Sequence, residues 1–323
     1  MDIVISHKSA LEYWRLHSRA KIDDTARLRR KNPPASLPGI ADIRGRVPSK
    51  LSYPINLMVS SQNAKRKSAL FQPRVYAGRL PDWCFISIGD GLAVSSPAFC
   101  FFQMASELPL VKLIELGLEL CGTYSLSVKD EYVPGMDASD RNEYDHPQLA
   151  SKKALENLTA RMAGANGYKK ACQALRYIAE GSASPMETIL FMLLALPHKL
   201  GGYELPVPVM NRRIDNGQAA RQRSGTAYHS CDLFWPEAGF AVEYDSDFYH
   251  TGANRIAKDA EKRNNLADLD ITVITVTSRQ VRIAAEFDGL ARLIARKLHK
   301  RLRYENPRQF LDAKRELRRL LLR

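Results

Sequence analysis

Two acidic residues stand close together in a stretch that predicts a β-hairpin. Asp232 lies near the end of a first predicted strand, and Glu243 lies inside the next, which is otherwise apolar over 240–244. Pro236 and Gly239 between them predict a turn. Because paired strands run about 5 Å apart, both carboxylates can converge on one point. A charge in an apolar strand needs a partner, so this pair in a basic protein indicates a divalent cation and a phosphodiester.

Residues that follow Glu243 extend this candidate site. Asp245 lies two residues after Glu243 and therefore faces the same side of the strand. It is expected to be a metal ligand, a group that orients the ligands or simply a turn residue. The backbone carbonyl of Tyr244 is a natural additional metal ligand. His250 is expected either to act on a phosphate group or to be structural.

Positive charge comes next in the chain. Arg255, Lys258, Lys262 and Arg263 lie on one predicted helix, where Lys258 and Lys262 share a face. One of these lysines is expected to project over a phosphate, unless the face is merely solvated, and Arg255 and Arg263 are expected to contact nucleic acid. A simpler interpretation also stays open, in which the two carboxylates only form a salt bridge with Arg255 or Lys258.

The order of these features over about residues 182–288 resembles the PD-(D/E)XK nuclease superfamily, in its compact branch related to very-short-patch repair endonucleases. The resemblance implies a restriction-endonuclease-like mixed sheet flanked by helices. It implies Mg²⁺, with Mn²⁺ as a substitute, held by Asp232, Glu243, Tyr244 and Glu187, the last at the start of an apolar helix. Catalytic roles are expected for Glu187, Asp232, Glu243, Asp245, His250, Lys258 and Lys262. The family lysine two residues after the second acid is replaced here by Asp245.

The first third of the chain has a different pattern. Short β-like runs at 54–60, 71–76, 83–88 and 92–95 precede helical periodicity over 99–106 and 109–121. Ser9-Ala10-Leu11 with Trp14, Arg79-Leu80-Pro81 and the run VSSPA at 94–98 resemble AbiE-type abortive-infection antitoxins. The resemblance implies a smaller mixed α/β domain ahead of the nuclease, and a role in phage defence or as a toxin-like effector.

Composition limits the possible partners. The net charge of +13 favours a polyanion, most simply double-stranded DNA. Five scattered cysteines without a CxxC pair indicate reduced thiols and a cytoplasmic protein. The longest apolar run, at 189–196, is far shorter than the ~20 residues that span a bilayer, so no membrane partner is expected.

The C-terminal stretch concentrates the positive charge. Residues 292–323 hold twelve Lys or Arg and three acids. The pattern predicts two amphipathic helices separated near Pro307, whose charges either bind phosphates or are merely solvated. The residues expected to bind nucleic acid here are Arg296, Lys297, Lys300, Arg301 and Arg303.

The expected organisation is an antitoxin-like domain over 1–127, an acidic linker over 128–147, connecting helices over 148–181, a nuclease domain over 182–290 and basic helices over 291–323. The expected function is that of a magnesium-dependent endodeoxyribonuclease, with a homodimer or a defence-system protein as a further partner. The alternative is a non-catalytic DNA-binding regulator or antitoxin on a decayed nuclease fold, which the missing lysine favours.

Overall fold

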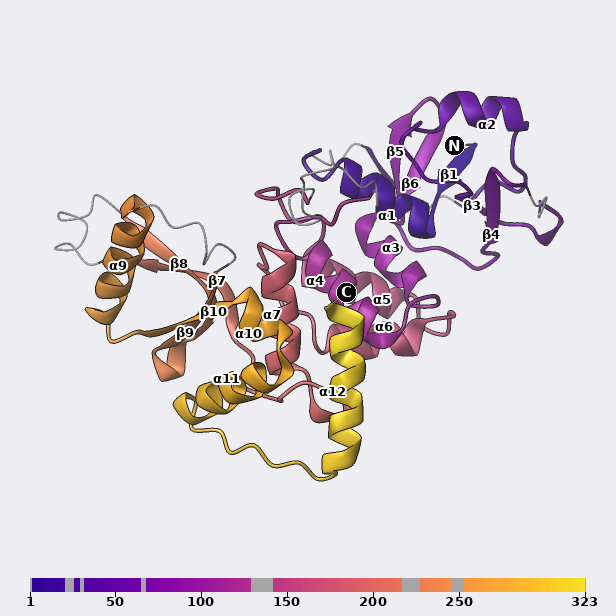
Figure 1. Ribbon diagram of the computed structural model, residues 1–323. Coiled ribbons are helices and arrows are strands. Elements are labelled where there is room, and N and C mark those ends of the chain that lie inside the picture. Colours follow the sequence, from indigo (N-terminus) through magenta and orange to yellow (C-terminus); the bar gives the residue numbers. More distant parts are fainter. Residues whose placement is uncertain are drawn as a thin grey trace. The chain divides into compact units, whose positions relative to one another are not determined.

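A computed structural model of the chain describes residues 2–20, 26–29, 32–64, 68–128, 142–216, 227–245 and 253–322, without the side chains of 64 and 253–259. The chain divides into two compact units, Met1–Ile178 and Ala179–Arg323. Each unit contains a mixed sheet flanked by helices, so the expected α/β class is confirmed (Figure 1). The first unit is the longer of the two, although the sequence predicted the smaller domain there.

The sheet of the first unit has six strands in the order β2-β5-β6-β1-β3-β4. The central strand β1 runs parallel to β6 and antiparallel to β3. Its three residues are fully buried. Three consecutive apolar residues show no alternation, which is why the sequence pattern did not predict this strand. The strands are β1 (Ile3–Ile5), β2 (Arg27–Leu28), β3 (Ile55–Val59), β4 (Phe71–Val75), β5 (Phe85–Gly89) and β6 (Leu92–Ser95).

The helices of the first unit are α1 (His7–Leu16), α2 (Ile40–Arg46), α3 (Pro97–Met104), α4 (Leu110–Leu120), α5 (Lys152–Arg161) and α6 (Tyr168–Leu175). Trp14 ties α1 to the sheet, because its indole N–H donates a 2.7 Å hydrogen bond to the carbonyl of Ser95. Helix α2 was not predicted from the sequence. It buries only Ile43, so its apolar periodicity is too weak to reveal a helix.

Two parts of the expected domain plan belong to the first unit. Helices α5 and α6, expected to connect two domains, lie within Met1–Ile178. Ser125, which lies just before the expected acidic linker, is paired with Glu143 inside it, because their amides donate to each other's carbonyls at 2.8 and 3.0 Å. Residues on both sides of 129–141, which lie outside the described residues, therefore belong to this unit.

The second unit has a four-stranded sheet in the order β10-β9-β8-β7. Strands β7, β8 and β9 are antiparallel neighbours, and β10 runs parallel to β9. The turn expected between β8 and β9 is the short helix η5 (Pro236–Ala238), closed by Gly239 at a φ of 53°. The strands are β7 (Val209–Asp215), β8 (Tyr228–Trp235), β9 (Phe240–Asp245) and β10 (Thr272–Thr277).

Helices cover this sheet and build the core of the second unit. They are α7 (Pro185–Ala195), the short η4 (His198–Leu200), α9 (Ala253–Ala267), α10 (Ser278–Arg282), α11 (Ala284–Lys297) and α12 (Pro307–Leu321). Helix α7 is apolar on all sides and buried from Glu187 to Leu194, as a central core helix must be. On α9, Leu266 packs against Cys231, Phe234 and Ala241 of the sheet. None of the helices in the described part of the chain has the length and apolar character needed to cross a membrane.

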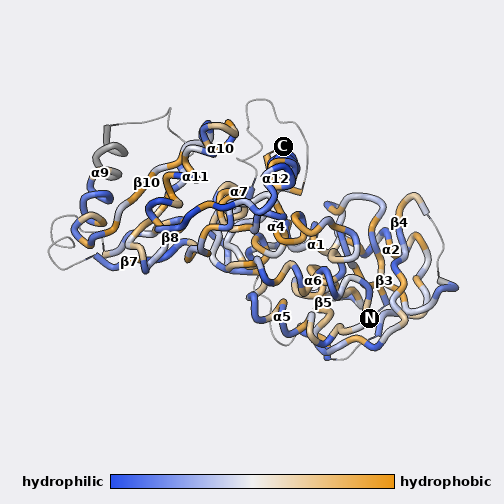
Figure 2. Tube along the Cα trace, turned by 90° about the horizontal axis from the view of Figure 1, so that it is seen from below, coloured by the Kyte–Doolittle hydropathy of each residue, from blue (hydrophilic) through white to orange (hydrophobic). Residues whose placement is uncertain are grey.

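Helix α12 docks on the second unit through an apolar face, visible in Figure 2 as orange segments between blue ones. Phe310, Leu317 and Leu320 are buried. Lys314 is also buried, and its ammonium donates to both oxygens of Asp288 at 2.8 and 2.9 Å. The basic C-terminal stretch is therefore not a free arm, because its last helix is part of the packed unit.

Candidate functional site

Asp232 connects β8 to β9 through its side chain. The backbone pairing of these strands runs from Trp235↔Phe240 to Leu233↔Val242. Beyond that point the Asp232 carboxylate accepts a 2.8 Å hydrogen bond from the backbone N–H of Tyr244. The sequence had predicted Asp232 near the end of its strand, but the residue lies inside β8. Its carboxylate takes the place of a backbone acceptor where the strands separate.

Glu187 enters the same region from α7. Ser184 caps this helix by accepting a hydrogen bond from the Glu187 amide, and Pro185 occupies its first turn. The Glu187 carboxylate is buried and accepts a hydrogen bond from the amide of Ala183 at 2.9 Å. It also accepts one from the side-chain amide of Asn211 on β7.

Asn211 is a site residue that the sequence analysis missed. Its side chain donates both to Glu187 and to the carbonyl of Gly181, the latter at 2.8 Å. Its backbone has a φ of 47°, in the left-handed region that asparagine tolerates better than most residues. The strand that contains Asn211 was not predicted, and a polar residue with an apolar neighbour on only one side carries no clear sequence signal.

Glu243 is paired with a cation from the following helix. Lys262 Nζ lies 2.6 Å from Glu243 Oε1, and both side chains are largely buried, with exposed fractions of 26% and 19%. The approach is close enough for an ion pair but is not aligned as a hydrogen bond, so Oε1 is a buried oxygen without a hydrogen-bond donor among the described residues. Lys262, one of the two lysines proposed from sequence, therefore lies at a carboxylate.

Burial and mutual repulsion shape the electrostatics of the site. Burial raises the pKa of Asp232 to about 7, with the neighbouring Glu187 and Glu243 carboxylates adding to the effect. The Tyr244 N–H and the Lys262 ammonium oppose it. Burial also raises the pKa of Glu187, against the hydrogen bonds from Ala183 and Asn211. The Asp232 carboxylate therefore lies in the negative field of both neighbouring carboxylates, which disfavours its charged form.

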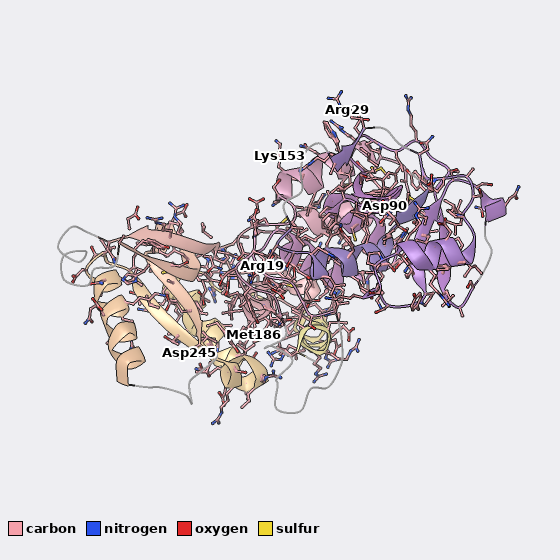
Figure 3. The ribbon with its side chains drawn as sticks, turned by 90° about the horizontal axis from the view of Figure 1, so that it is seen from above. Arg19, Arg29, Asp90, Lys153, Met186 and Asp245 are labelled. Carbon is pink, nitrogen blue, oxygen red and sulfur yellow. The ribbon has the colours of Figure 1, made fainter. Side chains whose placement is uncertain are left out.

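Other predicted site residues lie at the edge of this arrangement or outside it. Asp245 ends β9, opposite Thr277 of β10, and Figure 3 labels it together with Met186, which precedes Glu187 on α7. Arg263 instead lines a cavity of about 410 Å³ with Asp270 and Thr272, at the start of β10. The structure therefore does not bring Arg263 to the carboxylates.

Three of the predicted residues cannot be placed at side-chain level. His250 lies outside the described residues. Arg255 and Lys258 belong to α9 by their backbone, and their side chains lie outside the described part of the chain. Their proposed roles stay predictions, as does that of the Tyr244 carbonyl.

The basic residues of the C-terminal stretch fall into two groups. In α12 three arginines are engaged within the protein: Arg318 donates to the carbonyls of Val281 and Arg282, and Arg315 and Arg319 pair with acids of their own helix. Around the end of α11 they are exposed, and none forms an ion pair with another described residue. We call this second group the α11 basic cluster; it consists of Arg296, Lys297, Lys300, Arg301 and Arg303.

The carboxylate oxygens at this site suit a hard divalent cation. Among the described residues, however, no three His, Cys, Asp or Glu side chains form a ready metal-binding group. Such cations take oxygen ligands and keep several bound waters. Glu243 Oε1 is buried without an aligned donor, and Asp232 is held among like charges. A divalent cation would relieve the repulsion around Asp232 and would take the place of the Lys262 ammonium at Glu243 Oε1, so these residues fit the metal that the sequence predicted.

Comparison with known proteins identifies no relative: no protein-family model, no curated protein and no solved structure matches this chain. Function has to be inferred from the chemistry of the site itself.

Proposed function

We propose that this protein is a metal-dependent endonuclease that hydrolyses phosphodiester bonds of DNA, and that Ala179–Arg323 is a restriction-endonuclease-like domain. The observation that carries the proposal is the 2.6 Å approach of Lys262 to Glu243. The superfamily that the sequence resembles places a lysine two residues after its second acid, where this chain has Asp245. A lysine from α9 supplies that positive charge at the same acid.

The order of elements in the second unit supports the fold assignment. Helix α7 precedes three antiparallel strands, and helix α9 then leads to β10, which is parallel to β9. This order brings Glu187, Asp232 and Glu243 together from α7, β8 and β9. The helix and final strand after the second acid are the elements that the resemblance required.

Each residue has a distinct task in this proposal. Asp232 and Glu243 would hold Mg²⁺ or Mn²⁺, with Glu187 acting directly or through a water molecule and the Tyr244 carbonyl as a further ligand. When bound, the metal ion lowers the pKa of a water molecule and stabilises charge on the phosphate. Lys262 moves from Glu243 towards a phosphate oxygen and stabilises the additional negative charge of the transition state. Asp245 orients the ligands, and His250 contacts the phosphate.

The test is a cleavage assay with the purified full chain on plasmid and single-stranded DNA, in Mg²⁺, Mn²⁺ and EDTA. Asp232→Ala and Glu243→Ala should abolish cleavage and remain folded. Glu237→Gln is a matched control, because Glu237 is an exposed acid in the turn between the same two strands. Full cleavage by either site variant, or metal-independent cleavage by the parent, would refute the assignment.

In a second candidate function, the protein binds DNA but does not hydrolyse it. Asp245 at the position of the usual lysine favours a non-catalytic DNA-binding regulator or antitoxin on a decayed nuclease fold. In that case the parent binds DNA and leaves it uncut with either metal. The biological setting we propose, phage defence or a toxin-like effector with a homodimer or defence-system protein as partner, rests on the resemblance of the first unit to AbiE-type antitoxins.

A further inference from the structure

Strands β7 and β8 form a two-stranded ribbon that extends beyond β9. The two strands pair from Val209↔Phe234 to Asp215↔Tyr228, whereas β9 pairs only with Leu233–Trp235 of β8. The outer half of the ribbon, 212–215 with 228–231, therefore begins directly beside the site residues Asn211 and Asp232. A side chain on this ribbon can reach a substrate that is bound at the carboxylates.

One face of the ribbon carries an ordered arginine. The guanidinium carbon of Arg213 lies 3.8 Å from the centroid of the Tyr228 ring. Arg213 Nε is 3.1 Å from an oxygen of Asp215. Stacking and ion pairing together hold the guanidinium plane in one orientation. Its two terminal nitrogens have no acceptor among the described residues, and 61% of the side chain is exposed.

The direction of Arg213 is set by its neighbour in the strand. Ile214 packs against the core cluster that includes Leu266 of α9. Successive strand residues point to opposite faces, so Arg213 points away from α9. Helix α7 lies on that other side of the sheet (Figure 1), and from there Glu187 accepts the hydrogen bond of Asn211.

The spacing between Arg213 and the carboxylates matches a short step along a nucleic acid. Arg213 follows Asn211 by two residues, or roughly 7 Å of strand. A DNA strand advances about 3.4 Å per nucleotide along the helix axis. A phosphate one or two nucleotides from the reacting one would therefore lie within reach of the guanidinium.

We infer that Arg213, held by Tyr228 and Asp215, binds a backbone phosphate of DNA one or two nucleotides from the phosphodiester at the carboxylates. The inference rests on the proposed function for the position of the reacting phosphate. Guanidinium groups bind phosphate through two parallel N–H donors, and here both terminal nitrogens are oriented before the ligand arrives. Arg213 is a binding residue and not part of the hydrolytic machinery.

The first measurement is the salt dependence of DNA binding in EDTA, with the full chain and a short fluorescent duplex. Arg213→Gln should weaken binding about 10-fold, as expected for the loss of a charged hydrogen-bonding pair. It should also reduce the slope of log affinity against log salt by about 0.9, the value for one phosphate. Arg315→Gln is the matched control, because Arg315 is an exposed arginine that also pairs with an aspartate, and its slope should not change.

The second measurement is a cleavage ladder in Mg²⁺ on DNA that carries one neutral methylphosphonate. In the parent, the neutral group should suppress cuts one or two nucleotides away, and in Arg213→Gln that local suppression should disappear. An unchanged salt slope in Arg213→Gln would overturn the inference, and so would a ladder identical to that of the parent. If the parent never cuts DNA, the proposed function fails, whereas a slope reduced only in Arg213→Gln still establishes the phosphate contact.

Discussion

Nζ of Lys262 lies 2.6 Å from Oε1 of Glu243, so a helix that follows β9 delivers a positive charge to an acid in the strand. The strand itself carries Asp245 where a lysine would supply the charge locally. The side chain of Lys262 has two possible partners, the carboxylate in the free protein and a phosphate in a complex. Because Lys262 belongs to α9 and not to β9, its side chain can exchange the carboxylate for the phosphate.

Replacing Lys262 by Ala should reduce the turnover of DNA by about 10²–10³-fold, because a preorganised charge at the transition state is removed. DNA affinity should change far less, since many other phosphate contacts persist. Single-turnover cleavage rates and binding constants, measured on the same duplex, separate the two effects.

Lys258→Ala is the control, one helical turn earlier in α9. It should retain most of the turnover. A larger loss of turnover with Lys258→Ala than with Lys262→Ala would assign the catalytic cation to Lys258, and losses of cleavage matched by equal losses of binding would remove both from the chemistry.

Asp232 should make the stability of the second unit depend on pH. Burial and neighbouring carboxylates raise its pKa from 3.8 to about 7. Between these values the folded state holds a proton that the unfolded state has released, so stability falls as pH rises from about 4 to 7. Asp232→Asn should remove this dependence and raise the free energy of unfolding at pH 8 by up to about 4 kcal/mol.

Urea denaturation in EDTA at a series of pH values measures this effect. Glu237→Gln should show the pH dependence of the parent, because that acid is exposed. Addition of Mg²⁺ at pH 8 should stabilise the parent and leave Asp232→Asn nearly unchanged. A parent whose stability rises between pH 4 and 7 in this unit would contradict the proposed ionisation of Asp232.

Asn211→Gly should weaken the response of cleavage to metal. Glycine adopts the φ of 47° without strain, so the substitution removes the amide and keeps the backbone. Glu187 then loses the donor that β7 supplies. The loss of a group that orients a metal ligand typically costs 10–100-fold in metal affinity or activity. The Mg²⁺ concentration for half-maximal cleavage should rise accordingly. A lower melting temperature with an unshifted Mg²⁺ titration would show that Asn211 is structural only.

Neutralising the α11 basic cluster should weaken DNA binding in a salt-dependent way. Changing Arg296, Lys300, Arg301 and Arg303 to Gln removes four exposed charges, and the salt slope should decrease by about 0.9 for each phosphate that the variant no longer neutralises. Arg315→Gln with Arg319→Gln is the control, since those side chains pair with acids of α12. Equal slopes for both variants would mean that the cluster is only solvated. Deleting 306–323 is unsuitable for this test, because α12 is packed into the unit.

The Lys314–Asp288 ion pair should be important for stability. Lys314 is 8% exposed, and Tyr203 also donates its hydroxyl to Asp288. Asp288→Ala would leave a buried ammonium without its carboxylate and should cost about 3 kcal/mol of unfolding free energy. Asp288→Leu combined with Lys314→Met should recover part of that loss in urea denaturation. A single variant as stable as the parent would show that the ammonium reaches solvent.

The parts of the fold that sequence predicted are those with strong periodicity or clear end signals. Helix α7 begins at a serine cap with proline in its first turn, and the β8–β9 turn is marked by Pro236 and Gly239. Strand β1 was missed because its three buried apolar residues show no alternation. Strand β7 was missed because only Met210 in it is buried, so it carries no apolar pattern. The mixed α/β class was therefore predictable, whereas the order of strands was not.

The candidate site was predictable in its residue types and only partly in its contacts. Sequence identified Glu187, Asp232 and Glu243, but not that Tyr244 bonds Asp232 or that Asn211 holds Glu187. These contacts depend on where β8 and β9 separate and on a left-handed residue in β7, and neither leaves a local pattern. The contact between Lys262 and Glu243 also required the three-dimensional position of α9.

The docking of α12 has a consequence for how the protein folds during its synthesis. Gly201 follows η4 with a φ of 88°, and a Cβ there would overlap the carbonyl oxygen of Ala313 on α12. Gly201 is synthesised early in the second unit, whereas α12 is synthesised after every candidate site residue. The close fit therefore joins an early segment to a late one. On the ribosome, the chain therefore exposes its acidic centre before the helix that completes its support has been synthesised. A nascent chain paused before α12 would carry all the chemical groups of the site on a scaffold that is still unfinished.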